Sequence, residues 1–127
     1  MIKPIPEGWH TVTPRLFVEE PERLVAFLKD AFGAVEGPRV REDAPAELRI
    51  GDSMVMVGNA QVRRETSSFF YLYVRDADAT YRKALEAGAA SLEEPELTLY
   101  GDRRATVEDP FGNVWQIATH VKDHERP

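Results

Sequence analysis

Two segments of the sequence, Leu16–Ala34 (LFVEEPERLVAFLKDAFGA) and Leu72–Ala89 (LYVRDADATYRKALEAGA), follow the same pattern. Each begins with a short apolar run that is typical of a β-strand and continues with an amphipathic stretch of helical periodicity. Each then reaches a glycine of the kind that ends helices, and about three further strand-like runs follow. The repeat predicts an internal duplication in which each half folds as a strand, a helix and three strands.

Working outward from these segments places the other elements. In the first half we expect strands over 11–18, 35–40, 46–50 and 53–57, a helix that opens over 19–22 and ends at Gly33, and a loop over 58–67. In the second half we expect strands over 69–74, 90–92, 104–107 and 114–119, and a helix over 79–87 that is capped at 76–78. A loop around Pro95 and a turn over 109–113 complete this half.

These elements predict an α+β fold of one domain over residues 1–127. It consists of tandem βαβββ modules, module 1 over about 9–58 and module 2 over about 67–121. The modules are expected to form a curved mixed sheet with a helix on the outer face of each module. No linker is expected between them, because neither half could bury its apolar face alone.

Composition narrows the function classes. The chain has 127 residues, a net charge of −6 and no cysteine, which excludes disulfides, thiolate zinc sites and cysteine nucleophiles. No apolar run approaches the roughly 20 residues of a membrane span, and the first residues do not look like a secretory signal. We therefore expect a cytoplasmic protein that binds neither membrane nor nucleic acid, since its basic residues are scattered among acids. The acidic balance suits a cationic ligand or simply solubility.

Five motifs carry a resemblance to a known family: Pro6–Pro14 (PEGWHTVTP), Ala31–Ala34 (AFGA), Glu47–Ser53 (ELRIGDS), Tyr100–Arg103 (YGDR) and Glu108–Trp115 (EDPFGNVW). Over residues 6 to 121 the chain resembles the vicinal oxygen chelate superfamily, which includes glyoxalase I, bleomycin-resistance proteins and extradiol dioxygenases. The resemblance is closest to the PhnB-like branch. It implies the same duplicated fold, but one fold hosts many chemistries.

The resemblance also implies where a metal would bind. Metal-dependent members take His, Glu or Gln ligands from their first, fourth, fifth and last strands. Carried over by motif, these positions fall on Thr13, Met56 (or Val55 if the register slips by one), Phe69 and Gln116. Only Gln116 is a plausible ligand, because a thioether and a phenyl ring do not bind hard or borderline divalent cations. We therefore expect no metal and no other cofactor.

Strand alternation predicts which side chains face the cavity instead. Most of the expected ligand-binding residues are aromatic or methionine, and a few are polar. Tyr100 and Arg103 come from a loop that can border the cavity. The full set is Arg15, Phe17, Met54, Met56, Phe69, Tyr71, Tyr73, Tyr100, Arg103 and Gln116. Alternatives stay open: these side chains can fill the space or pack on a second subunit, Arg15 can pair with an acid, and Tyr100–Arg103 can be a turn with an internal ion pair.

No catalytic residue is assigned, because no serine triad, phosphate-binding loop or paired-carboxylate motif is visible. His10 is expected at the surface, and His120 and His124 lack metal-ligand spacing. We predict a metal-independent protein that sequesters an apolar or aromatic compound, as antibiotic-resistance members do, and that forms a homodimer, as members of the superfamily commonly do. One alternative is a lyase, isomerase or dioxygenase-type enzyme that uses Gln116, Tyr71 and Arg15 as polar groups or recruits a metal through unrecognised ligands. The other is a structural or regulatory dimer without a ligand.

Overall fold

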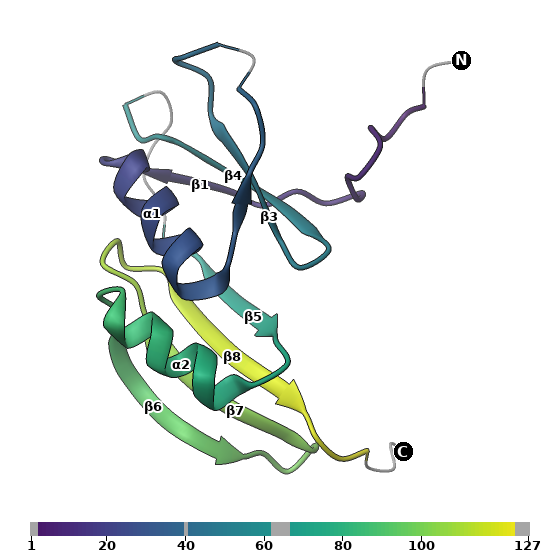
Figure 1. Cartoon of the computed structure of the whole chain (residues 1–127), viewed down its shortest axis with the longest axis vertical. Helices are drawn as coiled ribbons and strands as arrows, with labels where there is room; N and C mark the ends of the chain where they lie inside the picture. The colour runs from purple at the N-terminus through teal and green to yellow at the C-terminus, as the bar shows by residue number, and fades with distance from the viewer. Residues whose placement is uncertain (1–2, 40, 62–66, 124–127) are drawn as a thin grey trace. The chain divides into compact units, whose positions relative to one another are not determined.

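The computed structural model describes residues 3–39, 41–61 and 67–123 (Figure 1). The chain divides into two compact units, and each is described by itself. The first contains residues 1–29 and 33–66, and the second contains 30–32 and 67–127. The boundary near residue 66 falls between the two halves of the predicted duplication.

The first unit holds a four-stranded mixed sheet and helix α1. Its elements are β1 (Arg15–Val18), α1 (Pro21–Phe32), β2 (Val35–Glu36), β3 (Ala46–Ile50) and β4 (Ser53–Asn59). The strand order is β1-β4-β3-β2, in which β1 runs parallel to β4 and the other pairs are antiparallel.

The second unit repeats this arrangement. Its elements are β5 (Phe69–Tyr73), α2 (Ala77–Glu86), β6 (Ala90–Leu97), β7 (Asp102–Glu108) and β8 (Val114–His120). The strand order is β5-β8-β7-β6, again with one parallel pair between the first and last strands. The α+β class and the tandem βαβββ arrangement are therefore confirmed, with one four-stranded sheet in each unit.

The helices begin and end close to where their capping residues predict. Pro21 occupies the first turn of α1. The helix ends at Gly33, which has a left-handed backbone conformation (φ +68°), and the Ala34 N–H donates to the Leu28 carbonyl. In the second unit, the Asp76 carboxylate accepts a hydrogen bond from the Ala79 N–H. This cap starts α2 at Ala77, two residues earlier than predicted.

Several strand predictions are wrong in extent, and a proline bears on the three largest differences. Strand β1 begins at Arg15 rather than at residue 11, directly after Pro14, and β2 ends at Glu36, just before Gly37 and Pro38. Conversely, β6 continues through Pro95 to Leu97, where a loop was expected. Strand β6 lies at the sheet edge and its pairing with β7 contains two register shifts, so the missing N–H of proline is tolerated there.

One face of each sheet is buried and the other is more open. In the second unit, α2 packs on β6, β7 and β8 (Figure 1). The buried apolar side chains of this unit include Ala77, Ala84, Ala105, Val107, Trp115 and Ile117. In the first unit they include Leu16, Val18, Leu24, Leu28, Leu48, Val55 and Val57. The placement of Trp115 and Ile117 in the buried core agrees with the predicted strand alternation.

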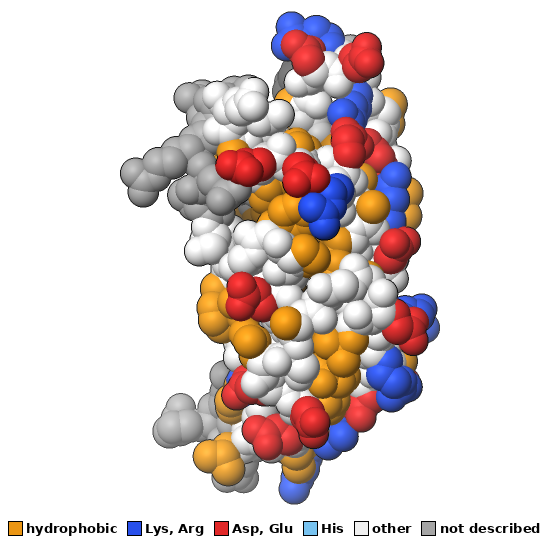
Figure 2. Space-filling view, turned by 90° about the vertical axis from the view of Figure 1, so that its left-hand side faces the viewer, with side chains coloured by type: hydrophobic (Ala, Val, Ile, Leu, Met, Phe, Trp, Pro, Cys, Tyr) orange, Lys and Arg blue, Asp and Glu red, His pale blue; other side chains and the backbone are white. Residues whose placement is uncertain are grey.

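Two surface properties bear on function. No helix in residues 3–39, 41–61 and 67–123 is long and apolar enough to cross a membrane. On the face drawn in Figure 2, Lys and Arg side chains are interleaved with Asp and Glu rather than gathered in a basic band. A basic band is what phosphate backbones select, so this face offers no such surface.

Candidate functional site

The open face of the second sheet carries three aromatic side chains in a row on β5. Phe69, Tyr71 and Tyr73 are 66%, 38% and 63% exposed, whereas Phe70 points the other way and its ring lies 4.5 Å from that of Trp115. Side chains alternate along a strand, so all three aromatic residues share the face that the sequence assigned to a cavity. A contiguous exposed apolar stripe of this kind marks an interaction site more often than an isolated exposed residue does.

The strand register adds polar side chains to this face. Tyr71 lies opposite Gln116 of β8, and Gln116 lies opposite Thr106 of β7. The Thr106 hydroxyl donates to the carboxylate of Glu93 on β6. The second sheet therefore carries aromatic rings beside an amide and a carboxylate, with the buried Thr106 hydroxyl between these two groups, and such a mixture is expected of a small-molecule site.

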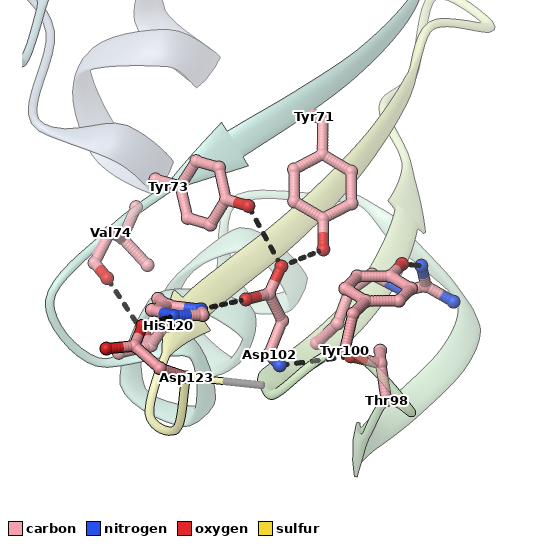
Figure 3. A network of polar contacts seen from close by, with 10 residues as sticks. Tyr71, Tyr73, Val74, Thr98, Tyr100, Asp102, His120 and Asp123 are labelled. Carbon is pink, nitrogen blue, oxygen red and sulfur yellow. Dashed lines mark hydrogen bonds and ion pairs between the residues drawn. The ribbon is translucent and has the colours of Figure 1, made fainter. Parts of the chain in front are cut away.

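Asp102 is the centre of the polar network at this face (Figure 3). Its carboxylate is 1% exposed. One oxygen, Oδ2, accepts the hydroxyls of Tyr71 at 2.6 Å and Tyr73 at 3.0 Å, and Oδ1 lies 2.7 Å from Nδ1 of His120. His120 Nε2 in turn lies 2.7 Å from Asp123 Oδ1. A buried carboxylate with this many donors is fully satisfied and therefore stable as an anion.

The surroundings shift the pKa of three of these groups. Burial raises the pKa of Asp102, but the hydrogen bonds from Tyr71, His120 and Tyr73 outweigh it and leave the pKa of this carboxyl below its usual range. Burial raises the pKa of the Tyr71 hydroxyl, and the hydrogen bond to Asp102 raises it further. The hydrogen bond to Asp102 raises the pKa of His120, with a second contribution from Asp123.

The position of His120 between two carboxylates determines its protonation. An ionised carboxylate only accepts hydrogen bonds, so both ring nitrogens of His120 must carry a hydrogen to make both 2.7 Å contacts. The two carboxylates therefore favour the imidazolium form of His120, in the same direction as its raised pKa. His120 joins β8 to β7 through Asp102 and to the residues that follow β8 through Asp123.

Replacing His120 by glutamine is expected to change stability in a pH-dependent way. Because the folded protein raises the pKa of His120 above 6.5, the stabilisation is fully present below the unfolded value and is lost as pH rises through the folded value. The melting temperature of the natural protein should therefore exceed that of His120→Gln most near pH 6, and the gap should shrink towards pH 9. A gap that stays constant over this range would show that the imidazolium contributes no linked stability.

Two other predicted residues of this unit lie in different places. Arg103 points to the helix side, where its guanidinium forks onto the Asp78 carboxylate of α2 with two 3.0 Å contacts. Tyr100 is half-exposed near the open face, and its hydroxyl accepts a hydrogen bond from Arg104. The Arg104 guanidinium also lies 6.0 Å from the ring centre of Tyr71. The arginine at the aromatic face is therefore Arg104.

The predicted residues of the first unit line separate hollows. Arg15, Met56 and Glu47 form a row across β1, β4 and β3. Arg15 and Met56 line a hollow of about 400 Å³ together with Trp9, His10 and Glu47. Phe17 lies against Gly58 and lines another hollow of about 570 Å³, and Met54 is buried. The structure thus brings Phe69, Tyr71, Tyr73 and Gln116 together, whereas Arg15, Phe17, Met54 and Met56 belong to the first unit.

Sequence reasoning missed Asp102, Arg104 and His120. The strand predicted over 104–107 left Asp102 in a loop, and in the structure β7 begins at Asp102 and places it opposite His120. Alternation from Thr106 back through Arg104 to Asp102 was the available signal. It required knowing where the strand begins, which the sequence pattern did not indicate.

The residues at the metal positions implied by the resemblance do not fit a metal ion. Met56 lines the hollow beside Thr13, whereas Val55 is buried, so the thioether and not the neighbouring residue occupies this position. A threonine hydroxyl, a thioether, the Phe69 ring and the Gln116 amide are not a usable donor set for a divalent cation. Within the described parts of the chain, no group of three or more His, Cys, Asp or Glu side chains is placed to hold a metal.

Comparisons with known proteins agree with the fold. Residues 10–117 match the family model described as the glyoxalase/bleomycin resistance protein/dioxygenase superfamily. An uncharacterized protein of Mycobacterium bovis is 32% identical over 128 residues, which cover 88% of this chain and 84% of that protein. Among solved structures, TioX from Micromonospora sp. ML1 has a TM-score of 0.77 at 23% identity and covers 88% of this chain and 99% of its own. A glyoxalase/bleomycin resistance protein/dioxygenase family enzyme from Burkholderia phytofirmans has a TM-score of 0.75 at 22% identity, with coverages of 86% and 97%.

Proposed function

This chain belongs to the glyoxalase/bleomycin resistance protein/dioxygenase superfamily, and from that premise we propose that it is a metal-independent protein that binds and sequesters a small apolar or aromatic compound. The observation that supports this most is the open aromatic row of Phe69, Tyr71 and Tyr73 beside Gln116 and Arg104. Planar ligands stack on such rings, while a few polar groups set their orientation. Within the superfamily we place it with the PhnB-like, drug-resistance type.

Truncating Phe69 tests the stacking surface. The Phe69 ring is 66% exposed, so Phe69→Ala should leave the fold intact and remove one stacking partner. We expect the Kd of two neutral planar probes, 2-naphthol and acridine, to rise about tenfold, which corresponds to about 1.4 kcal/mol. Fluorescence titration or calorimetry at pH 7.5 measures the change.

Val35→Ala is the matched control for that substitution. Val35 is also 66% exposed, but it lies on β2 of the first unit, so its truncation should leave the Kd of both probes unchanged. If neither probe binds the natural protein, the proposed function is wrong. If both bind but Phe69→Ala and Val35→Ala behave alike, the ligand lies elsewhere than on the aromatic row.

A second candidate function, a lyase or isomerase, is favoured by one specific observation. The face carries a buried carboxylate, Asp102, next to a charged and partly exposed imidazole, His120. Such a pair can accept and release protons, which general acid–base chemistry requires. Mass spectrometry of a bound compound before and after prolonged incubation separates the two functions: unchanged compound supports sequestration, and conversion supports the enzyme.

We also propose that the protein acts in the cytoplasm as a homodimer. A second copy of the chain could cover the exposed aromatic row, which is the arrangement expected if the protein were a structural or regulatory dimer without a ligand. Light scattering with and without 2-naphthol separates these possibilities. If 2-naphthol inhibits dimerisation, ligand binding and subunit contact use the same surface. If dimerisation is unchanged by 2-naphthol, they use different surfaces.

A further inference from the structure

Asp102 is a buried charged residue that is hydrogen-bonded to two exposed residues of the aromatic row, Tyr71 and Tyr73. Its carboxylate is almost fully buried, whereas the two tyrosine side chains that bind it are 38% and 63% exposed. The exposed ring surfaces are the parts that a stacked ligand would touch. Asp102 itself is buried and meets the hydroxyl groups of the two tyrosines, so its effect on a ligand passes through Tyr71 and Tyr73.

The two tyrosines are held by a single carboxylate oxygen. The hydroxyls of Tyr71 and Tyr73 both donate to Oδ2 of Asp102, and their ring centres lie 5.2 Å apart with planes inclined at 56°. Since both hydroxyls converge on one atom, rotation of either ring away from this arrangement breaks a charge-assisted hydrogen bond. The two rings are therefore ordered before any ligand arrives.

Asp102 is itself fixed from two further directions. Its backbone N–H donates to the Thr98 hydroxyl at 3.0 Å, and its Oδ1 lies 2.7 Å from Nδ1 of His120. His120 is held in turn by Asp123. Groups from β5, β7 and β8, together with the residues that flank β7 and β8, thus determine where Oδ2 lies (Figure 3).

We propose that Asp102 is the positioning residue of the aromatic site, because it orders Tyr71 and Tyr73 in the arrangement that receives a planar ligand. This inference rests on the proposed binding function. An exposed aromatic side chain that is free to rotate loses that freedom when a ligand stacks on it, and this loss weakens binding. Because Asp102 already restricts the rotation of both rings in the free protein, ligand binding costs less side-chain entropy.

The test compares two carboxylates of the same unit. Asp102→Ala should raise the Kd of 2-naphthol and of acridine about tenfold, the size expected for ordering two side chains on binding. The matched control is Asp78→Ala, which removes the carboxylate that pairs with Arg103 on the helix side and should change each Kd less than about twofold. Asp102→Asn has the same shape. Its amide oxygen can accept the two hydroxyls while its NH2 group donates to Nδ1 of a neutral His120, so it should restore most of the affinity.

A spectroscopic measurement tests the same contact without a ligand. The absorbance of tyrosinate should show one tyrosine of the natural protein ionising well above the usual pKa, as burial and Asp102 dictate for Tyr71. In Asp102→Ala and Asp102→Asn this tyrosine should ionise at lower pH, because the negative charge is gone. An unchanged titration would show that Asp102 does not hold Tyr71.

Each outcome supports or overturns the inference. If both probes bind the natural protein and Asp102→Ala equally well, Asp102 is not a positioning residue although the proposed function stands. If neither probe binds the natural protein, the proposed function fails, whereas the tyrosine titration still shows whether Asp102 orders Tyr71. If circular dichroism shows that Asp102→Ala is unfolded, the double variant Tyr71→Phe/Tyr73→Phe replaces it: the rings remain but lose their anchor, so the same rise in Kd is expected and an unchanged Kd overturns the inference.

Discussion

Replacing Asp109 by alanine is expected to lower the free energy of unfolding by about 3–5 kcal/mol. Asp109 is a buried carboxylate in the turn between β7 and β8. It accepts hydrogen bonds from the backbone N–H groups of Phe111 and Asn113, from the Asn113 side-chain amide and from the Trp115 indole N–H. Asn113 and Trp115 are themselves buried, so alanine would leave their donors without a partner and out of reach of water. Urea denaturation followed by tryptophan fluorescence measures the loss.

The control is an aspartate of the same unit with a single bond to lose. Asp76 caps α2 at an exposed position, where its carboxylate accepts one hydrogen bond from the Ala79 N–H. Asp76→Ala should therefore cost only about 1 kcal/mol, the usual value of an N-cap. Equal losses for the two variants would show that the turn network adds nothing to an ordinary cap.

Replacing Gly101 by alanine is expected to cost about 2–4 kcal/mol and to release the residues after β8. Gly101 has φ +90°, and a Cβ built there would lie 1.7 Å from the backbone oxygen of Lys122. The Gly101 carbonyl accepts hydrogen bonds from the N–H groups of Val121 and Lys122, so the two segments lie in direct contact. Since backbone cannot yield as a flexible side chain can, one segment must move. Hydrogen exchange at the Val121 and Lys122 amides should accelerate in the variant.

Gly112→Ala separates the steric clash from the backbone conformation. Gly112 has a similar φ of +86°, but no atom lies within 4 Å of the Cβ position. This variant carries only the conformational cost, about 1 kcal/mol, and should leave exchange at Val121 and Lys122 unchanged. If Gly101→Ala were no worse than Gly112→Ala, the contact with Lys122 would not constrain the chain.

Features that depend on interactions between neighbours in sequence were predicted better than features that depend on distant residues. Helix ends depend on neighbours in sequence, such as Gly33 after α1, and they were predicted to within about two residues. The alternation of Phe69, Tyr71 and Tyr73 against Phe70 was also predicted, because the period of a strand is a local property. The extents of β1, β2 and β6 were not, because proline acts differently in an edge strand, at a strand start and at a strand end.

The polar centre of the site could not be predicted for a different reason. Asp102 and His120 are 18 residues apart in sequence and meet because β7 and β8 pair with one particular register. Asp102 reaches Tyr71 and Tyr73 only because β8 lies between β7 and β5 in the sheet. A shift of one residue in that pairing would turn Asp102 to the helix side, where Arg103 now lies.

The sequence by itself determined the duplicated βαβββ pattern and the aromatic character of one face, since helical and strand periodicities and capping residues act within a few positions of each other. Through the family resemblance it also predicted that the four positions implied for a metal hold no usable set of ligands. Only the tertiary structure decided that Arg104 rather than Arg103 lies beside Tyr71, and that one buried carboxylate anchors two exposed tyrosines. Register and strand order are cooperative properties of the whole sheet, and they are set by which apolar residues can be buried together rather than by any single stretch of the chain.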